Sequence, residues 1–350
     1  MQLEDLGWTP SRSNELDRDA HPHRQPGRIA RIDGARATAW TTSGEQFVDL
    51  PSKLRRGQHS LVVGDWITID PMPDGSARAA GVLERHTSLG RRAAGRQVRR
   101  QLLAANVDTA FIVSSMDDDL RERRLERYLT VVHDGGVTPV ILLTKAGLVD
   151  DPEPFLRRAR SVASDVAVHA IDVLAGIGVD VLETYVQPGA TITLLGSSGV
   201  GKSTVVNHLM GRTTMATHAV RTRDGRGQHT TTYRELFLLP NGGIVIDTPG
   251  LRELALWTDA SALDRTFPDV EALARDCRFG DCTHGHEPGC AVLEAVAEGT
   301  LDAGRFESYV ELHREVERTA AQMPTHERRR AERKLGKMYR EIQQHKRRRR

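Results

Sequence analysis

Short apolar runs separated by turn residues occupy the first 85 positions of the chain. The turns include Asp33-Gly34 and Asp74-Gly75, and this spacing is typical of a small β-barrel. The expected strands cover 27–31, 37–41, 46–50, 61–70 and 79–83. The pattern predicts an OB-type barrel over 26–85, preceded by a free, mobile arm, 1–25, with a short helix at 3–6. Such barrels often bind oligonucleotides, although a purely structural barrel is an alternative.

A different pattern begins near residue 106, where apolar strands alternate with amphipathic helices. The expected strands cover 109–114, 137–143, 166–171, 191–195, 235–239 and 244–246, and the expected helices cover 120–133, 152–163 and 204–210. This alternation is typical of an α/β domain with a mostly parallel sheet and helices on both faces. Ligands of such sheets bind beyond the carboxyl ends of the strands. We therefore expect an α/β domain over 105–260, joined to the barrel by an arginine-rich linker, 86–104.

A phosphate-binding loop is predicted at the centre of this domain. Residues 196–203 read G-x-x-x-x-G-K-S between an expected strand and an expected helix. We expect its backbone N–H groups to donate hydrogen bonds to a polyphosphate, Lys202 to bind the β- and γ-phosphates, and Ser203 to be a ligand of Mg²⁺. A plain turn before a helix is the alternative. The predicted nucleotide-binding residues here are Gly196, Ser197, Ser198, Gly199, Val200, Gly201, Lys202, Ser203 and Thr204.

Two further segments complete the expected chemistry of phosphate hydrolysis. Asp247 opens D-T-P-G after an apolar strand, where an acidic residue helps to hold Mg²⁺ and Gly250 can offer its N–H to the γ-phosphate. The segment 225–232 is rich in glycine and threonine, as a switch loop is. We expect Thr231 to complete the Mg²⁺ ligands and His229 to position the attacking water. A polar surface loop is the alternative for this segment.

All three cysteines of the chain lie within one short segment. Cys277, Cys282 and Cys290, together with His284, supply three thiolates and one imidazole, the donor set of a structural zinc site. Three free thiols beside a bystander histidine is the alternative, and His286 is a spare candidate ligand. The sequence thus predicts one Zn²⁺ in a helical domain over 261–325.

Charge and composition place the protein among soluble factors that meet nucleic acid. The 350-residue chain has a net charge of only +2, but a basic tail, 326–350, ends in Arg347 to Arg350. Such tails usually meet nucleic acid or anionic surfaces, although a solvated end is the alternative. The sequence has no apolar run long enough for a membrane span and no signal peptide. We expect a cytoplasmic monomer that binds no membrane.

With these motifs together, the chain resembles the RsgA (YjeQ) family, the circularly permuted small ribosomal subunit biogenesis GTPases. The resemblance covers residues 3 to about 320 and includes Leu6-Gly7-Trp8, Val63-Gly64-Asp65, 104–108 (AANVD), Arg127-Tyr128-Leu129, and the segments 277–284 and 287–290. It implies an OB barrel, a permuted GTPase domain and a zinc-bearing C-terminal domain. It also implies hydrolysis of GTP to GDP on the 30S subunit, late in its maturation, and contact with 16S rRNA. His229 matches the family's proposed catalytic histidine.

The family's base-recognition sequence, N/T-K-x-D, has its counterpart in Thr144, Lys145, Ala146 and Gly147, ahead of the phosphate loop as permutation requires. Gly147 stands where the family has a guanine-reading aspartate, and Asp172-Val173 stands where it usually has Ser-Ala. A missing acceptor weakens discrimination between bases. We expect a reduced preference for GTP, restored by Gly147→Asp, unless Asp150 or Asp151 reaches the base.

The sequence therefore predicts a ribosome-associated GTPase. The alternatives are an RNA-binding P-loop protein with relaxed nucleotide specificity, or one with a degenerate, non-catalytic nucleotide site.

Overall fold

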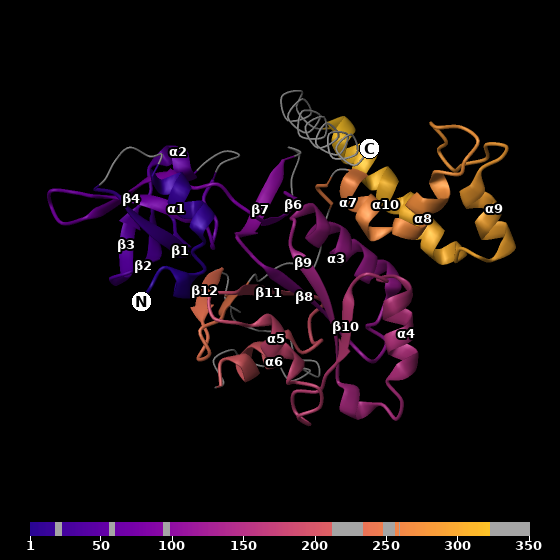
Figure 1. Cartoon of the computed structure of the whole chain (residues 1–350), viewed down its shortest axis with the longest axis horizontal. Helices are drawn as coiled ribbons and strands as arrows, with labels where there is room; N and C mark the ends of the chain where they lie inside the picture. Colours follow the sequence, from indigo (N-terminus) through magenta and orange to yellow (C-terminus); the bar gives the residue numbers. More distant parts are fainter. Residues whose placement is uncertain are drawn as a thin grey trace, which may run out of the picture. The chain divides into compact units, whose positions relative to one another are not determined.

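The computed structural model describes residues 1–17, 23–55, 60–93, 99–211, 234–247, 256–258 and 260–322. The chain divides into two compact units, one of 1–90 with 102–254 and the other of 91–101 with 255–350 (Figure 1). Three predicted site residues, His229, Thr231 and Gly250, lie outside the described residues, as does the basic tail.

Five strands close into a barrel at the start of the first unit. They are β1 (Gln25–Asp33), β2 (Arg36–Thr41), β3 (Gly44–Asp49), β4 (Trp66–Pro71) and β5 (Ala77–Val82), with the short helix α2 (Ser52–Arg55) after β3. Neighbours pair in the order β1-β2-β3-β5-β4, and β4 pairs back onto β1. Buried Ile29, Ile67 and Ile69 belong to the core inside it. The five predicted strands are thus confirmed.

One barrel strand is shorter than predicted. The apolar run from residue 61 was expected to belong to a single strand, but β4 begins at Trp66 because 61–65 forms a turn. The carboxylate of Asp65 accepts the Val62 N–H at 2.8 Å. Gly64 has φ +90, and a Cβ there would lie 2.1 Å from the carbonyl oxygen of Ala105, so only glycine fits this close approach.

The N-terminal arm is packed against the barrel, contrary to the expectation of a free arm. The predicted short helix is confirmed as a 3₁₀ turn, Glu4–Leu6. A second helix, α1 (Pro10–Asp17), was missed by the sequence analysis. Leu6 is fully buried, and the rings of Trp8 and Trp66 meet edge to face with centroids 4.8 Å apart. Buried Arg28 donates to the Leu6 carbonyl at 2.6 Å. These contacts hold Leu6 and Trp8 against the barrel. Moving Leu6 away would cost free energy, because the buried Arg28 guanidinium would lose a hydrogen-bond acceptor.

A six-stranded sheet forms the rest of the first unit. Its strands are β8 (Thr109–Ser115), β9 (Thr138–Thr144), β10 (Ala167–Ala170), β11 (Thr191–Leu195), β12 (Glu235–Leu238) and β13 (Ile244–Asp247). They lie in the order β10-β9-β8-β11-β13-β12, all parallel except β12, whose end at Glu235 pairs with Arg31 of β1. The predicted mostly parallel sheet is confirmed.

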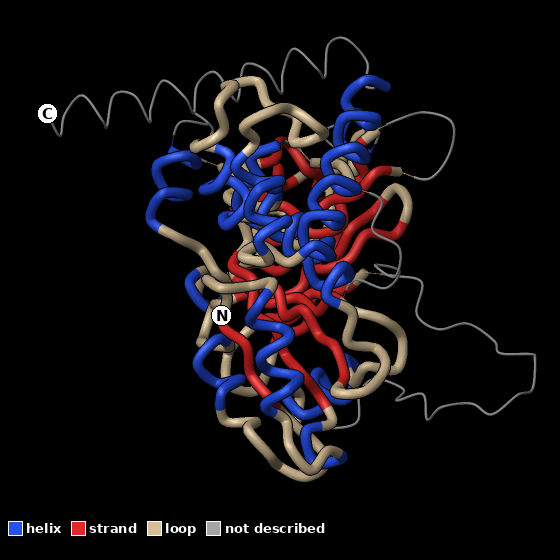
Figure 2. Tube along the Cα trace, turned by 90° about the vertical axis from the view of Figure 1, so that its right-hand side faces the viewer, coloured by secondary structure: helices blue, strands red, loops and turns tan. Residues whose placement is uncertain are grey.

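Helices cover both faces of this sheet (Figures 1 and 2). They are α3 (Glu122–Asp134), α4 (Glu153–Ser161), α5 (Val181–Tyr185) and α6 (Lys202–Leu209). Alternate strand residues such as Phe111 and Val113 pack with Leu182 of α5 and Val205 of α6. Because side chains of a strand point to opposite faces in turn, α3 and α4, which contact β8, β9 and β10, cover the other face. The strand that leads to the phosphate loop, β11, is therefore buried on both sides.

The expected linker contains two paired strands. β6 (Ser88–Arg92) and β7 (Arg100–Ala105) form a two-stranded sheet, where the arginine-rich composition had suggested irregular chain. Leu89 and Leu103 are buried in it, and these isolated apolar residues among arginines were too few to show a strand pattern.

From residue 255 onward, the described part of the second unit is helical, as predicted. It contains α7 (Ala260–Thr266), α8 (Pro268–Ala274), α9 (Ala291–Glu298) and α10 (Ala303–Gln322). The Arg305 guanidinium of α10 donates to Asp269 of α8 at 2.7 Å, next to fully buried Phe267. In the described part of the chain, no helix combines the length and apolar character that crossing a bilayer requires.

Candidate functional site

The phosphate loop has the backbone that its sequence predicts. Gly196 has φ +147, and a Cβ there would lie 2.2 Å from the Val113 carbonyl oxygen of the neighbouring strand. Gly199 and Gly201 also have positive φ, and Gly201 caps the N-terminus of α6. The Lys202 ammonium lies over the loop and donates to the carbonyl oxygens of Gly196, at 2.8 Å, and Ser197. The loop therefore wraps a cation at a helix N-terminus, where a polyphosphate is stabilised.

Asp247 ends the strand next to the phosphate-loop strand. β13 pairs in parallel with β11, and the Thr193 hydroxyl donates to the Ile246 carbonyl at 2.9 Å. Burial raises the pKa of Asp247, and the positive charge of Lys202 partly offsets this. A half-buried carboxylate next to the loop, with Ser203 in the first turn of α6, supplies the oxygen donors that Mg²⁺ prefers. The structure thus brings these predicted residues to one edge of the sheet.

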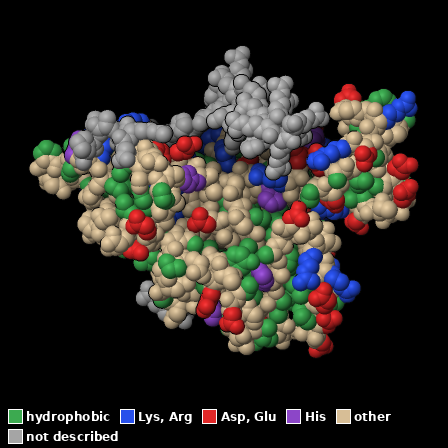
Figure 3. All heavy atoms as spheres, in the orientation of Figure 1, with side chains coloured by type: hydrophobic (Ala, Val, Ile, Leu, Met, Phe, Trp, Pro, Cys, Tyr) green, Lys and Arg blue, Asp and Glu red, His purple; other side chains and the backbone are tan. Residues whose placement is uncertain are grey.

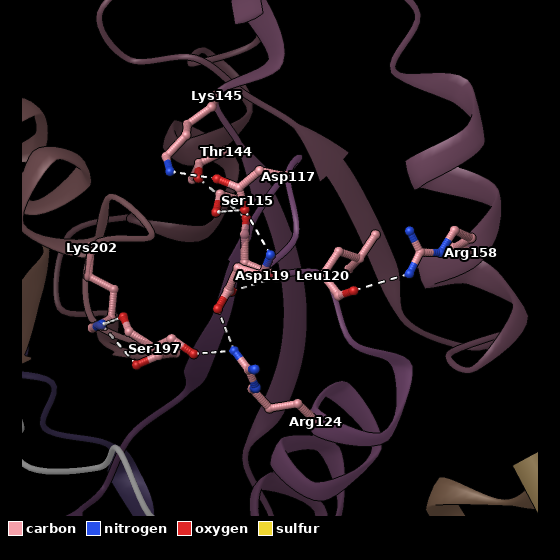
Figure 4. Close-up of polar contacts among 12 residues, drawn as sticks. Ser115, Asp117, Asp119, Leu120, Arg124, Thr144, Lys145, Arg158, Ser197 and Lys202 are labelled. Atoms are coloured by element: carbon pink, nitrogen blue, oxygen red, sulfur yellow. Dashed lines mark hydrogen bonds and ion pairs between the residues drawn. The ribbon is translucent and has the colours of Figure 1, made fainter. Parts of the chain in front are cut away.

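The loop after β9 is joined directly to the phosphate loop. The Thr144 hydroxyl donates to the Val200 carbonyl oxygen at 2.6 Å and lies 3.3 Å from that of Ser114. Lys145 has a left-handed backbone, φ +62, and its ammonium lies 2.8 Å from a carboxylate oxygen of Asp117 (Figure 4). The predicted base-recognition loop therefore lies beside the phosphate loop, as binding of one nucleotide requires.

Three polar residues at this edge were missed by the sequence analysis. Asp119 follows β8, and its carboxylate accepts hydrogen bonds from Ser114, at 3.1 Å, and from Arg124 of α3. The same Arg124 guanidinium donates to the Ser197 hydroxyl of the phosphate loop (Figure 4). Asp117 has a lowered pKa because hydrogen bonds, first of all from Lys145, outweigh the opposing effect of burial. The signal was available, since three aspartates follow directly after a buried parallel strand.

The loop after β10 lies against the loop after β9. The Ala146 N–H donates to the Ile171 carbonyl at 3.2 Å. Asp172 and Ile177 exchange two backbone hydrogen bonds, at 2.8 and 2.9 Å, which close residues 172–177 into a tight loop. A carboxylate oxygen of Asp172 accepts the N–H of Gly147 at 3.1 Å. The two positions at which the sequence departs from the family pattern are therefore in contact.

The predicted cysteine and histidine ligands form one cluster in the second unit. The ligand atoms of Cys277, Cys282, His284 and Cys290 all lie within 4.8 Å of one another. The Sγ atoms of Cys277 and Cys290 are 3.8 Å apart, and the His284 Nδ1 is 3.3 Å from Cys290 Sγ and 3.6 Å from Cys277 Sγ. A tetrahedron with Zn–S bonds of about 2.3 Å has S–S edges of about 3.8 Å. The donor set and spacing fit a tetrahedral metal ion.

The loop that carries His284 is held by its own carboxylate. Glu287 accepts the Thr283 hydroxyl, and also the N–H groups of Thr283 and Gly285 at 2.9 and 2.8 Å. These bonds, first of all that from the hydroxyl, lower the pKa of Glu287. Burial lowers the pKa of His284, which favours the neutral imidazole that a metal ligand requires. Among the described residues, His286 is not part of the cluster, and the other four predicted residues already supply four ligand atoms.

Comparisons with known proteins agree with this geometry. The model of the RsgA GTPase family matches residues 82–257. The chain is 38% identical over 341 residues to the small ribosomal subunit biogenesis GTPase RsgA 2 of Vibrio vulnificus, covering 97% of this chain and 95% of that protein.

The chain belongs to the RsgA GTPase family.

Two solved structures show the same fold. The crystal structure of YjeQ from Thermotoga maritima superposes with a TM-score of 0.64 at 25% identity, over 84% of this chain and 98% of that one. YloQ, a circularly permuted GTPase, gives a TM-score of 0.61 at 24% identity, over 85% and 96%. This RsgA chain shows the permutation directly, because the loop with Thr144 and Lys145 precedes the phosphate loop in sequence but lies beside it in space.

Proposed function

We propose that this RsgA protein hydrolyses GTP to GDP and phosphate on the 30S ribosomal subunit, late in its maturation. It would act as a monomer in the cytoplasm, where that subunit is assembled. The observation that supports this most strongly is the joined nucleotide site. The phosphate loop, Lys202, Asp247 and the Thr144–Lys145 loop lie at one sheet edge of a chain that belongs to this GTPase family.

Phosphate hydrolysis at this site would depend on positioning and electrostatics and would need no covalent intermediate. The loop N–H groups and the Lys202 ammonium would bind the phosphates and stabilise negative charge that develops on them. Ser203 and Asp247 would hold Mg²⁺, which neutralises phosphate charge when bound. Intrinsic turnover is expected at about 10⁻⁴ to 10⁻² per second, as for GTPases without a stimulating partner.

Residues outside the described part of the chain complete the proposal. Thr231 would provide a further Mg²⁺ ligand, Gly250 would donate its N–H to the γ-phosphate, and His229 would orient the attacking water. These roles are supported by their matches to the family pattern and by their positions before and after β12 and β13, whose ends lie at the site.

Contacts with 16S rRNA are proposed for the barrel and for the basic tail. Over α4, Lys and Arg side chains lie beside acidic ones (Figure 3), and Arg158 pairs with Glu122 and Arg160 with Glu153. Such a mixed surface has little attraction for phosphate backbones. The basic run Arg347 to Arg350 and the OB-type barrel are therefore better candidates.

We also propose that the Cys₃His cluster holds one structural Zn²⁺. Three thiolates and one imidazole at tetrahedral spacing leave no open coordination position, so the ion would cross-link the segment 277–290 and would take no part in catalysis.

Turnover measured with purified subunits tests the proposal. GTP hydrolysis should be slow for the protein alone and should rise at least about tenfold with 30S subunits, but not with 50S subunits. Turnover that ignores 30S subunits, or that rises equally with both, would contradict a role on the small subunit. No GTP hydrolysis under any condition would favour the non-catalytic alternative.

A further inference from the structure

The carboxylate of Asp172 occupies the space beside the missing side chain of Gly147. A Cβ built on Gly147 would lie 3.0 Å from Asp172 Oδ2, and the backbone N–H of Gly147 donates to the same oxygen at 3.1 Å. The loop after β9 has thus lost a carboxylate at position 147, and the loop after β10 provides one at the same place. The two departures from the family pattern can therefore be understood together, as the transfer of one carboxylate from position 147 to position 172.

The Asp172 carboxylate is held in place by backbone groups. Oδ1 accepts the N–H groups of Leu174, at 3.0 Å, and Ala175, at 3.1 Å, while Oδ2 accepts Gly147. Only 8% of the residue is exposed, and among the described residues it forms no ion pair. An ionised carboxylate offers about four acceptor sites, so one site remains on Oδ2. A buried carboxylate that has no cation beside it is costly to bury, and each further hydrogen-bond donor lowers that cost.

We propose that Asp172 reads the guanine base in place of the family's aspartate at position 147. This inference rests on the proposed function, since it assigns a base to the same nucleotide site. The free acceptor site on Oδ2 receives the N1–H of guanine. Adenine has a lone pair at N1, which the carboxylate repels, so the site discriminates between the two bases.

One acceptor site predicts a smaller discrimination than the usual arrangement. The family's aspartate accepts two guanine donors, whereas three of the four acceptor sites of Asp172 already hold backbone N–H groups. A single charge-assisted hydrogen bond corresponds to a preference of about tenfold to a hundredfold. The wild-type protein therefore selects guanine nucleotides over adenine nucleotides by this factor.

The structure also changes the expectation for Gly147→Asp. With Asp172 present, a side chain at position 147 would place a second carboxylate against the first, and two like charges at this distance repel. The single variant is therefore expected to bind guanine nucleotides less well. The exchange Gly147→Asp with Asp172→Ser should instead return the carboxylate to position 147 without the clash.

Asp172 has a structural alternative, because its bonds to Leu174 and Ala175 also cap the loop 172–177. A capping role alone predicts that substitution weakens all nucleotides equally. A base-reading role predicts loss of guanine affinity only. The ratio of the dissociation constants of GDP and ADP separates the two roles, and it does not depend on turnover or on ribosomal subunits.

The test is equilibrium binding of GDP and ADP, with Mg²⁺, to full-length wild type, Asp172→Asn and Asp172→Ser. Asp165→Asn is the matched control, because Asp165 is an exposed aspartate in the turn between α4 and β10. The GDP preference should fall by about tenfold to a hundredfold in both Asp172 variants, with ADP affinity within about twofold of wild type. The control should keep the wild-type ratio.

An unchanged ratio in the Asp172 variants, or an equal loss for GDP and ADP, overturns the proposal. So does a wild-type protein without guanine preference. If Asp172→Asn does not fold, the comparison of Asp172→Ser with the double variant Gly147→Asp/Asp172→Ser decides, because the proposal requires the double variant alone to recover the preference. Guanine selectivity without 30S-stimulated turnover would refute the proposed function and leave the role of Asp172 intact.

Discussion

The hydroxyl of Thr144 donates to the carbonyl oxygen of Val200 at 2.6 Å, so the loop after β9 is tied to the phosphate loop by one side chain. Thr144 is buried and also lies 3.3 Å from the Ser114 carbonyl. The hydrogen bond therefore connects the two halves of the proposed nucleotide site, which lie more than 50 residues apart in the sequence, at positions 144 and 200.

Thr144→Val removes this hydrogen bond with little change of shape. The net loss of about 0.5–1.5 kcal/mol predicts a twofold to tenfold weaker affinity for GDP and ADP alike, because the loops are loosened and no base contact is removed. Isothermal titration measures both. Thr138→Val, at an exposed position of the same strand, is the control and should bind as wild type. Weaker binding of only one nucleotide would contradict the coupling.

Lys202→Ala should abolish tight nucleotide binding and leave the fold intact. Removing two or more charge-assisted bonds to phosphate predicts a loss of at least about a hundredfold in GDP affinity. The free energy of unfolding should stay within about 1 kcal/mol of wild type, since the ammonium donates to the loop carbonyls of Gly196 and Ser197 and the change is confined to a loop. Normal affinity in this variant would exclude the phosphate-loop assignment.

Asp247→Asn should make the nucleotide-free protein more stable at neutral pH. Burial raises the pKa of Asp247, so the folded state holds this proton more tightly than the unfolded state does. Stability therefore falls as pH rises from about 3.9, the unfolded value, through the raised pKa, and the amide avoids this loss. Denaturation at several pH values should show a gain at pH 7 that disappears toward pH 4.

The same Asp247→Asn variant should lose Mg²⁺-dependent GTP hydrolysis, because an amide binds Mg²⁺ more weakly than a carboxylate. A variant that is destabilised at pH 7, or that hydrolyses GTP normally, would contradict the assigned environment or the assigned role.

His229→Ala should spare nucleotide affinity and reduce hydrolysis. A side chain that only positions the attacking water contributes to the transition state and little to the bound ground state, so turnover should fall about a hundredfold with GDP and GTP binding unchanged. Single-turnover hydrolysis with 30S subunits is the measurement. The neighbouring Gln228→Ala provides a control in the same segment. Unchanged stimulated turnover would exclude the catalytic role.

The purified protein should contain about one zinc per chain, and Cys282→Ser should lose it. The variant should be less stable, because the metal cross-links the segment 277–290. His286→Ala is the matched control, since this histidine lies in the same loop but outside the cluster, and it should keep the metal. Elemental analysis without zinc in freshly prepared wild type would refute the proposed zinc site.

Much of the fold and the site follows from local sequence. The phosphate loop was identifiable because Gly196 and Gly201 stand at the fixed positions of its motif, where the tight turn requires a positive φ. The cysteine cluster was identifiable because all three thiols lie in one segment. The barrel and sheet strands followed from apolar runs between turn residues. The proposed roles of His229, Thr231 and Gly250 remain predictions, because these residues lie outside the described part of the chain.

The features that were missed depend on contacts between distant segments. The arm's docking depends on Arg28 reaching the Leu6 carbonyl, and no local pattern encodes that pairing. The contact between Gly147 and Asp172 joins two loops 25 residues apart, so the sequence alone showed two separate departures from the family pattern. The sequence does not distinguish Arg124 from the other arginines on α3, and only the fold brings its guanidinium to the Ser197 hydroxyl.

The position of β11 between β8 and β13 has a consequence for synthesis on the ribosome. β8 pairs with β11 through contacts such as Thr109 with Ile192, so one edge of β8 stays open until the chain has grown by about 80 residues. At about 5–20 residues per second this interval lasts roughly 4–16 s. During it the loops after β9 and β10 exist without the phosphate loop, and an open strand edge can pair wrongly. The nascent chain therefore acquires the phosphate loop late, when β11 pairs with the open edge of β8, and the sheet is complete only after β12 and β13 have followed.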